Sequence, residues 1–512
     1  MLKKTAALVV MFFLVFMLQL SPVFCKEPVV KLGNEVLLSD YLDLVAGKRV
    51  GLVTNQTGVN SRGESIIDIF YKHPSINLVA LYAPEHGLDG RAKAGAYVES
   101  YIHEKLGIPV YSLYGQTRRP TADMLKDIDL LLFDIQDIGA RTYTYMSTLN
   151  YCIDAAKQYG KPILVLDRPN PLGGMVVEGP VLEDPYISFV GVDNLPMAHG
   201  MTAGELALFF NRKIGADVKV IPMKSYRRNM IFQDTGLPWV QTSPNIPGLV
   251  NCFGYMATGL GEGTGVFQAD QFQWIGGKGL NAQQFAEKLS QSGLRGVDFI
   301  PEQRGEAGGV RLAITDYYSF NPARTGIYAL AYAFSLGDFH VPKSGNTIVM
   351  FDKIMGTNKI GDYLERGLSP QQIEANYRPA LERFKAEREK YLLAEYAPQI
   401  VVKVSGAPIE FDSPPFIDKN DRLMVPLRAI GEALGAVVHW DAGRRTVSVV
   451  RGEKKIIFTI GSAEALVNGK ARAMDTVPVI KNNRTMLPLR YVGEFLGASV
   501  DWNGTWQIVH IS

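Results

Sequence analysis

The chain has 512 residues, of which 47% are apolar and 20% are charged. This is ordinary globular composition; it argues against a disordered chain, a fibrous repeat or a multi-pass membrane protein, and the length suggests about three domains. With 53 basic and 51 acidic side chains the formal net charge is +2, which leaves no basic excess for a nucleic-acid partner, and three cysteines are too few for a disulfide framework or a cysteine-rich zinc site.

Residues 1–25 have the features of a secretory signal peptide. Lys3 and Lys4 precede an unbroken apolar run from Ala6 to Leu18, which is too short for a comfortable membrane span. Cleavage after Cys25 predicts a secreted, extracellular protein. The alternative is a lipoprotein acylated on Cys25, which the bulky Phe24 disfavours. In an oxidising space the two other cysteines could pair, although the sequence does not decide this: Cys152 and Cys252.

Residues 29–200 predict an α/β domain. Continuous apolar runs rich in Val, Ile and Leu are typical of parallel strands that helices cover on both faces. Helical patterns lie between the runs, at Ser65–Tyr71 and Thr148–Tyr159. This alternation predicts a Rossmann-like, doubly wound parallel sheet. The four expected strands are Arg49–Asn55, Asn77–Pro84, Asp129–Asp134 and Pro162–Asp167.

Residues 201–397 predict an auxiliary α+β domain that completes a cleft with the first. It holds glycine-rich loops around residues 259–280 and ends in a long amphipathic helix with Pro398 after it. One face of that helix carries Leu381, Phe384, Arg388 and Tyr391.

Residues 398–512 contain an internal repeat with a constant offset of 62 residues, since Pro426 recurs as Pro488 and Trp440 as Trp502. Each copy indicates a strand, a short helix closed by glycine and a strand hairpin. Two copies predict a compact β-rich module with pseudo-symmetry. The paired tryptophans could contact sugar rings, but a place in the core is the favoured interpretation.

Polar side chains follow every expected strand of the first domain. Ligands bind outside the carboxyl ends of the strands in an open parallel sheet, so these side chains predict a polar cleft. The candidates for substrate binding are Asn55, Gln136, Arg141, Arg168, Asn170, His199 and Asn245.

Glu85 is the strongest catalytic candidate. It follows Pro84 at the end of the second strand, where a carboxyl group is partly removed from water, as suits a general acid. His86 could assist it or bind substrate. The alternative is that Glu85 caps the next segment and that His86 is a hydrogen-bonded loop residue.

A second cluster lies at the end of the third strand and consists of Asp134, Gln136, Asp137 and Arg141. One aspartate is expected to orient Arg141 in an ion pair and to leave its guanidinium fork free for an anionic group. The alternative is a structural ion pair, and the same choice applies to Asp167 and Arg168.

Two further candidates lie later in the chain. Thr202 and Glu205 have the spacing of a helix capping box, which explains both structurally and leaves His199 unexplained. Glu262 lies in a glycine-rich loop that could reach over the cleft, or it is an ordinary solvated glutamate.

The sequence lacks the G-x-S-x-G, Walker A, H-E-x-x-H and G-x-G-x-x-G motifs. A serine hydrolase, a P-loop NTPase, a zincin and a dinucleotide-binding enzyme all lose support. Carboxylate-driven hydrolysis, as in glycosidases, remains well supplied with residues and requires no metal or cofactor.

Several motifs resemble, in order, those of the exo-β-N-acetylmuramidases of the NamZ type. They cover about residues 29–396, and the most specific are Ala83–Gly87, Val110–Gly115, Phe133–Arg141, Leu166–Pro171, His199–Thr202, Ser243–Pro247 and Glu262–Thr264. The resemblance implies a two-domain cleft and release of N-acetylmuramic acid from the non-reducing ends of peptidoglycan fragments, with Glu85 as the favoured catalytic residue. Arg141 or Arg168 could then bind the lactyl carboxylate of the sugar.

The chain departs from the family pattern after Thr264, where Gly265–Phe272 replaces a stretch that usually contains an arginine. The tail resembles the domain called copper amine oxidase N-terminal-like, a wall-associated or stalk module. Its first repeat has one histidine, His439, whose counterpart is Asp501, so a three-histidine copper site cannot be built.

The leading hypothesis is a secreted exo-glycosidase for peptidoglycan fragments, which could associate with the cell wall through the tail. Glu85 is its general acid/base, and the second carboxylate is left open among Asp134, Asp137 and Glu262. The alternatives are a catalytically weakened sugar-binding or wall-associated protein, motivated by the altered loop, and a hydrolase of another amino sugar.

Overall fold

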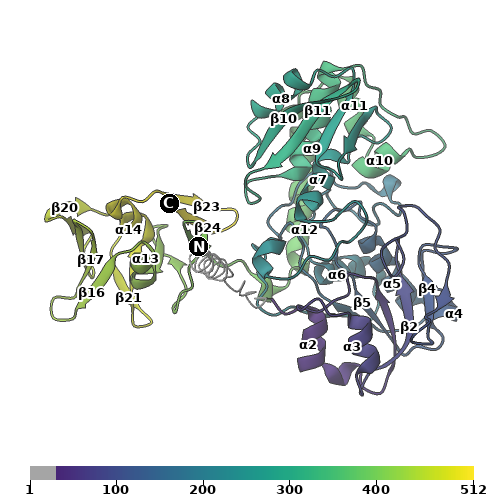
Figure 1. Cartoon of the computed structure of the whole chain (residues 1–512), viewed down its shortest axis with the longest axis horizontal. Coiled ribbons are helices and arrows are strands. Elements are labelled where there is room, and N and C mark those ends of the chain that lie inside the picture. The colour runs from purple at the N-terminus through teal and green to yellow at the C-terminus, as the bar shows by residue number, and fades with distance from the viewer. Residues whose placement is uncertain (1–29) are drawn as a thin grey trace, which may run out of the picture.

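A computed structural model describes residues 30–512 of the chain (Figure 1). The signal peptide expected at residues 1–25 lies outside the described residues. Within residues 30–512, none of the helices combines the length and the apolar character needed to span a bilayer. Cys152 and Cys252 are both buried and are not bonded to each other.

The first unit is built on a seven-stranded sheet in the order β3-β4-β2-β1-β5-β6-β7. All neighbours pair in parallel except β3 with β4. The strands are β1 (Arg49–Thr54), β2 (Asn77–Ala83), β3 (Tyr101–Ile102), β4 (Pro109–Ser112), β5 (Leu130–Asp134), β6 (Ile163–Leu166) and β7 (Val218–Ile221). The helices are α2 (Gly33–Asp40), α3 (Ile66–Lys72), α4 (Ala122–Leu125), α5 (Tyr145–Gln158) and α6 (Ala203–Ile214).

The parallel strands, taken in chain order, have the doubly wound arrangement 3-2-1-4-5-6. Alternate residues of β1 enter different cores, because Val50 and Leu52 pack with α2 and α3 whereas Val53 packs with α5 and α6. Helices therefore cover both faces, and the predicted fold class is confirmed. The strand order reverses between β1 and β5, which is where a ligand site is expected.

The sheet extends beyond residue 200, the boundary expected from sequence. β7 is half-buried, with Lys219 exposed on it, because it lies at the edge of the sheet. An edge strand of this kind has no continuous apolar run, which explains why the sequence pattern did not reveal it.

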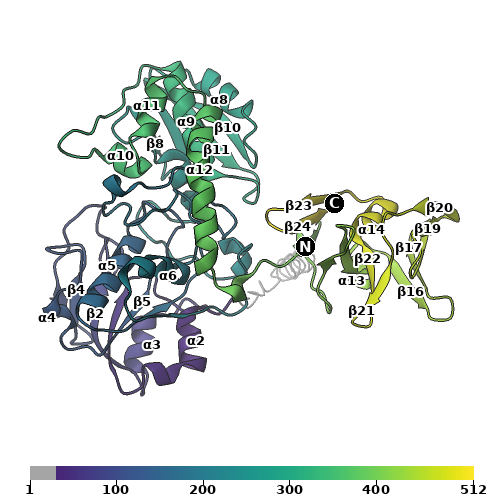
Figure 2. The same cartoon turned by 180° about the vertical axis from the view of Figure 1, so that it is seen from behind.

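The second unit is an antiparallel sheet in the order β10-β11-β9-β8 with helices packed on it. Its elements are α7 (Leu249–Thr258), β8 (Val266–Ala269), β9 (Trp274–Lys278), α8 (Ala282–Ser290), β10 (Val297–Arg304), β11 (Ala307–Ile314), α9 (Pro322–Leu336), α10 (Met350–Met355), α11 (Lys359–Glu365) and α12 (Pro370–Arg388). Helix α12 runs from this unit back to the first (Figure 2), where Phe384 packs edge-on against Phe209 of α6. Short 3₁₀ helices lie at Leu42–Leu44, Asp184–Tyr186, Phe232–Thr235, Glu389–Tyr391 and Ala394–Tyr396.

The third unit contains two four-stranded sheets, one five-stranded sheet and two short helices. Its strands are β12 (Val401–Val404), β13 (Ala407–Pro408), β14 (Phe416–Ile417), β15 (Leu423–Pro426), β16 (Val437–Asp441), β17 (Thr446–Arg451), β18 (Lys454–Thr459), β19 (Glu464–Val467), β20 (Lys470–Ala473), β21 (Val479–Lys481), β22 (Arg484–Pro488), β23 (Val500–Asn503) and β24 (Ile508–Ile511). Helices α13 (Leu427–Ala433) and α14 (Leu489–Leu496) follow β15 and β22 at equivalent places in the two repeats.

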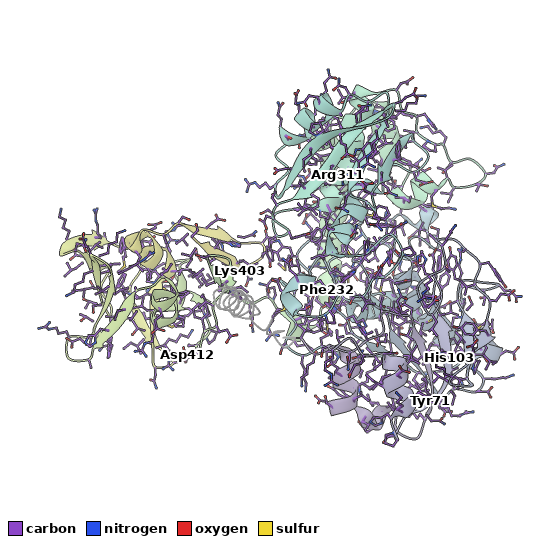
Figure 3. The ribbon with its side chains drawn as sticks, viewed as in Figure 1. Tyr71, His103, Phe232, Arg311, Lys403 and Asp412 are labelled. Carbon is purple, nitrogen blue, oxygen red and sulfur yellow. The ribbon has the colours of Figure 1, made fainter. Side chains whose placement is uncertain are left out.

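The third unit docks against the other two through the loop between β23 and β24. Trp506 of this loop is 2% exposed and belongs to the same core cluster as α5 and α6. Its carbonyl oxygen accepts a hydrogen bond of 2.7 Å from Asn229. Lys403 lies on the side of the module that faces the other units (Figure 3), where its ammonium donates to the Tyr318 hydroxyl at 2.8 Å.

Candidate active site at the strand ends

The loops after β1, β2 and β5 and the loop before α6 meet at the carboxyl edge of the sheet, beside the β1–β5 switch point. These loops carry the buried candidate side chains, of which His199 and Asp137 lie 3.7 Å apart. Burial raises the pKa of Tyr255, and the charges of Glu85 and Asp137 raise it further, so both carboxylates lie near enough to act on this tyrosine. We call Asn55, Glu85, Asp137 and His199 the strand-end site.

Glu85 is 8% exposed and accepts two hydrogen bonds. The backbone amide of Gly95 donates to Oε1 at 2.8 Å, and the Thr144 hydroxyl donates to Oε2 at 2.5 Å. Thr144 is the N-cap residue of α5, yet its hydroxyl does not cap the helix because it is turned toward Glu85. The carboxylate is thus held between a loop and a helix N-terminus, where partial positive charge stabilises an anion.

His86 has a left-handed backbone with φ of 71° and is 6% exposed. Its Nδ1 lies 2.7 Å from the carbonyl oxygen of Ala92, which only accepts, so Nδ1 carries the hydrogen. The ring contacts Tyr145 edge-on with centroids 6.4 Å apart. His86 therefore anchors the loop that supplies Gly95 to Glu85.

Asp137 and His199 form a buried pair with unused hydrogen-bonding capacity. His199 Nδ1 accepts from the Met201 amide at 3.2 Å, which places the hydrogen of the neutral ring on Nε2. That Nε2 lies 3.7 Å from Asp137 Oδ2, which accepts from the Gly139 amide at 2.8 Å. Within residues 30–512, neither His199 Nε2 nor Asp137 Oδ1 has a hydrogen-bond partner.

The loop after β1 carries two more side-chain atoms without a hydrogen-bond partner in the described chain. Asn55 Oδ1 accepts from the amide and hydroxyl of Thr57, whereas its Nδ2 has no partner in the described part of the chain. Gln56 Nε2 donates to the carbonyls of Gln241 and Thr242, and its Oε1 is likewise unpartnered there. Buried polar atoms are rarely left unpaired, so a cluster of them at one edge is what a polar ligand would satisfy.

Tyrosines surround Glu85, and the sequence analysis did not identify them. Burial and the charge of Glu85 raise the pKa of Tyr114, and the same causes act on Tyr145. The hydroxyl of Tyr145 donates to the Thr242 carbonyl at 2.5 Å, which ties α5 to the segment before α7. The run Thr142–Tyr145 directly follows Arg141, and its alternation of threonine and tyrosine was the available signal.

Arg141 does not provide a free guanidinium, and the expectation that an aspartate orients it is wrong. Its Nη atoms donate to the carbonyls of Pro180, Leu195 and Ile354 at 2.8, 2.8 and 2.5 Å. Burial without a carboxylate partner lowers its pKa to about 9. Arg141 therefore ties the strand edge to α10, because its fork is filled with carbonyl oxygens from distant segments.

Asp134 and Arg168 form a closed ion pair, the structural alternative considered from sequence. Arg168 Nε donates to Asp134 Oδ1 at 2.5 Å, and Asn34 donates to the other oxygen at 3.0 Å. Asp134 is fully buried, and a second guanidinium nitrogen of Arg168 binds the carbonyl of Val59. These contacts leave Asp134 no oxygen directed at a ligand.

Asp167, whose pairing with Arg168 was also considered, instead accepts from Thr202 and from the hydroxyl of Tyr396, each at 2.8 Å. Burial raises its pKa to about 7. The predicted capping box of Thr202 and Glu205 is confirmed at the start of α6.

The remaining candidates lie in supporting or exposed positions. Gln136 Nε2 donates to the carbonyls of Asp137 and Pro169, and Asn170 bonds the backbone of Met201 and Leu172. Both therefore fix the loops around the strand-end site. Asn245 and Glu262 are exposed, and within residues 30–512 no side-chain hydrogen bond joins Glu262 to another candidate.

Family models match the first two units. One described as "Exo-beta-N-acetylmuramidase NamZ, N-terminal" matches residues 50–250, and one described as "Exo-beta-N-acetylmuramidase NamZ, C-terminal" matches residues 253–393. Peptidoglycan beta-N-acetylmuramidase NamZ of Bacillus subtilis (strain 168) is 44% identical over 385 residues, which cover 72% of this chain and 92% of that relative.

The chain belongs to the NamZ family.

Two solved structures of DUF1343 family proteins from Bacteroides fragilis NCTC 9343 are similar to this NamZ-family chain. They are 35% and 29% identical, with TM-scores of 0.64 and 0.54, and each match covers 71% of this chain and 98% of the other. The resemblance inferred from the motifs is thereby confirmed.

A model described as "Copper amine oxidase N-terminal domain" matches residues 403–511. The structure offers no donor set for copper there, since residues 30–512 contain no group of three or more His, Cys, Asp or Glu side chains that could hold a metal ion. His439 lies on β16 and His510 on β24, in different sheets. The histidines of the module of this NamZ-family protein therefore do not form a shared metal site.

The segment that departs from the NamZ pattern reaches the strand-end site through one aromatic contact. Asp270, Gln271 and Phe272 are consecutive residues with left-handed backbones, φ of 51°, 53° and 71°. Phe272 packs edge-on against Tyr255 with centroids 4.9 Å apart. The altered loop thus supports Tyr255, whose pKa the charges of Glu85 and Asp137 raise.

Proposed function

We propose that this protein is an exo-acting β-N-acetylmuramidase that releases N-acetylmuramic acid from the non-reducing ends of peptidoglycan fragments. Family membership supports a glycoside hydrolase, and the Bacillus subtilis relative is named a peptidoglycan β-N-acetylmuramidase. The observation that carries the proposal is the strand-end site, where buried Glu85 is held by Gly95 and Thr144, and buried Asp137 follows another strand at the same edge of the sheet. Most glycosidases use a pair of carboxyl groups that flank the scissile glycosidic bond.

Glu85 is proposed as the general acid/base. It is buried, it is oriented by two donors, and its position follows a strand that supplies rigid support. Asp137 is the proposed second carboxylate. Its rivals are less suitable, because Asp134 is closed in an ion pair and Glu262 is exposed, whereas Asp137 keeps one buried oxygen without a partner in residues 30–512.

The polar groups of the sugar have matching partners. Asn55 Nδ2 and His199 Nε2 are donors without partners in the described chain, and they can bind the acetamido or lactyl oxygens of N-acetylmuramic acid. This assignment takes the place of Arg141, whose fork already binds three carbonyls. Secretion by residues 1–25 and a part in cell-wall turnover complete the proposal.

The test is hydrolysis of a chromogenic β-N-acetylmuraminide and of the matching β-N-acetylglucosaminide. The wild type should prefer the muraminide, and Glu85→Gln and Asp137→Asn should each lower kcat by about 10²- to 10⁴-fold. Glu287→Gln is the matched control, since Glu287 is an exposed carboxylate on α8. Equal turnover by wild type and Glu85→Gln would refute the role of Glu85.

The altered loop at Gly265–Phe272 motivates a second candidate, a sugar-binding protein with weakened catalysis. Binding of N-acetylmuramic acid without turnover of either substrate would favour it. Turnover of the glucosaminide alone would instead indicate a hydrolase of another amino sugar.

A further inference from the structure

A groove of about 660 Å³ lies in the third unit, between the first repeat and the β21–β22 hairpin of the second, far along the chain from the strand-end site. Its volume is within the range of about 300–1,000 Å³ that small-molecule sites occupy. The groove is bounded by β16 and β17, the start of α13 and the hairpin between β21 and β22. Asp412, on its rim, lies at the lower edge of the module in Figure 3, whereas Lys403 faces the other units.

The groove combines an aromatic wall with charged groups at its rim. Trp440 is half-buried against the module's core and lines the groove beside Val438, and Ile480 is 46% exposed there. Arginines and carboxylates surround them: Glu410, Asp412, Arg428, Glu432 and Arg484. A half-buried indole between polar groups is suited to a ligand with one apolar face and a polar edge.

Most of the charged side chains at the rim of the groove form no ion pair within the described chain and could bind a ligand. Asp412 is paired with Arg484 at 2.5 Å. By contrast, Glu410, Arg428 and Glu432 make no side-chain hydrogen bond or ion pair with any residue from 30 to 512, and all three are exposed. A ligand could therefore bind them without breaking an existing interaction.

The equivalent residues of the second repeat are arranged differently. Its equivalent of Trp440 is Trp502, which is 42% exposed, and the equivalents of Arg428 and Glu432 lie 3.9 Å apart as an ion pair between Arg490 and Glu494. The offset of 62 residues also aligns exposed Arg444 with Trp506, which is buried in the docking contact. The second repeat thus docks the module through Trp506, while Arg444 and Trp440 of the first repeat stay clear of that contact.

We propose that the groove binds an uncharged stretch of an amino-sugar chain. A pyranose ring offers an apolar C–H face for Trp440, and its hydroxyl and acetamido groups can bond the free carboxylates and Arg428. Three carboxylates against two guanidinium groups give the rim a negative balance, which disfavours anionic polymers. The choice of an amino-sugar ligand rests on the proposed function, since the N-acetylglucosamine units of peptidoglycan carry no lactyl group and are uncharged.

The test is calorimetric titration of the full-length protein with a linear β-1,4 hexamer of N-acetylglucosamine, which carries no muramic acid to release. The wild type should bind it, and Trp440→Ala should weaken binding by about tenfold or more, as loss of a central aromatic anchor does. Trp440→Phe, which keeps an aromatic face, should weaken it less. Trp502→Ala is the matched control and should bind as the wild type does.

Several outcomes would overturn the inference. They are absence of hexamer binding by the wild type, undiminished binding by Trp440→Ala, and equal losses in Trp440→Ala and Trp502→Ala. Muraminide turnover, measured on the same samples, should be unchanged by Trp440→Ala. If no variant or wild type turns over the muraminide and the hexamer still binds through Trp440, the proposed activity fails while the groove assignment stands.

Discussion

Replacing Trp506 by alanine should uncouple the third unit from the rest of the protein. Trp506 is 2% exposed, and its ring packs edge-on against Tyr318 with centroids 5.3 Å apart. It also fits against Gly173, whose φ of 74° and lack of a side chain leave room, because a Cβ there would lie 2.8 Å from the indole. The core of the module is a separate cluster, so the loss should fall on the docking contact.

The expected magnitude follows from burial. Truncating a buried tryptophan to alanine removes about 3–5 kcal/mol of stability, through lost transfer free energy and the cavity left behind. The bonds from Asn229 to the carbonyls of Gln399 and Trp506 use backbone acceptors and survive the substitution. They leave a weakened contact in which the units move independently, as small polar interdomain contacts do.

Two measurements check this prediction. In scanning calorimetry the variant should show the module unfolding apart from the other units, and limited proteolysis should cut near residues 397–400. The control is Trp502→Ala, whose side chain is 42% exposed and should change stability by less than about 0.5 kcal/mol. An unchanged calorimetric trace together with unchanged protease resistance for Trp506→Ala would refute the reasoning.

Three other predictions concern the strand-end site and its supports. Thr144→Val removes the hydroxyl that donates to Glu85, so kcat for the muraminide should fall by about ten- to a hundredfold while the melting temperature changes little; unchanged kcat would contradict this role. Arg141→Met leaves three buried carbonyls unpaired and should lower the free energy of unfolding by at least about 2 kcal/mol; the alternative, an anion-binding role, would appear as a raised KM with stability intact. Burial raises the pKa of Asp167 to about 7 from 3.8, so between these pH values the folded state holds a proton that the unfolded state has lost. The free energy of unfolding should therefore fall as pH rises from about 4 to about 7, and urea unfolding of Asp167→Asn should lack this part of the pH dependence. The same pH dependence in wild type and Asp167→Asn would contradict the prediction.

Local sequence signals were sufficient for much of the fold. The four runs expected as strands coincide with β1, β2, β5 and β6, because strands covered on both faces must be apolar at nearly every position. The capping box at Thr202 could be predicted because its hydrogen bonds join residues three apart. The repeat could be recognised because its two copies keep a constant offset, and the family could be recognised because its motifs are contiguous.

The sequence predicted only part of the strand-end site. Topology places Asn55, Glu85 and Asp137 at one edge, so a rule about strand ends finds them. The rule does not say which polar side chains at that edge already have their hydrogen bonds made by other parts of the protein. Asp134 and Arg141 fit the pattern as well as Asp137 does, yet contacts from other parts of the chain occupy them.

The sequence by itself determined four of the seven strands of the first sheet, the doubly wound class, the repeat and the family, since each is encoded over a few neighbouring residues or a fixed spacing. Only the tertiary structure decided which side chains remain free. Arg141 bonds carbonyls 39, 54 and 213 residues away, and Trp506 contacts Asn229 across 277 residues. Hydrogen-bond satisfaction and burial depend on such distant partners, and no local pattern records them.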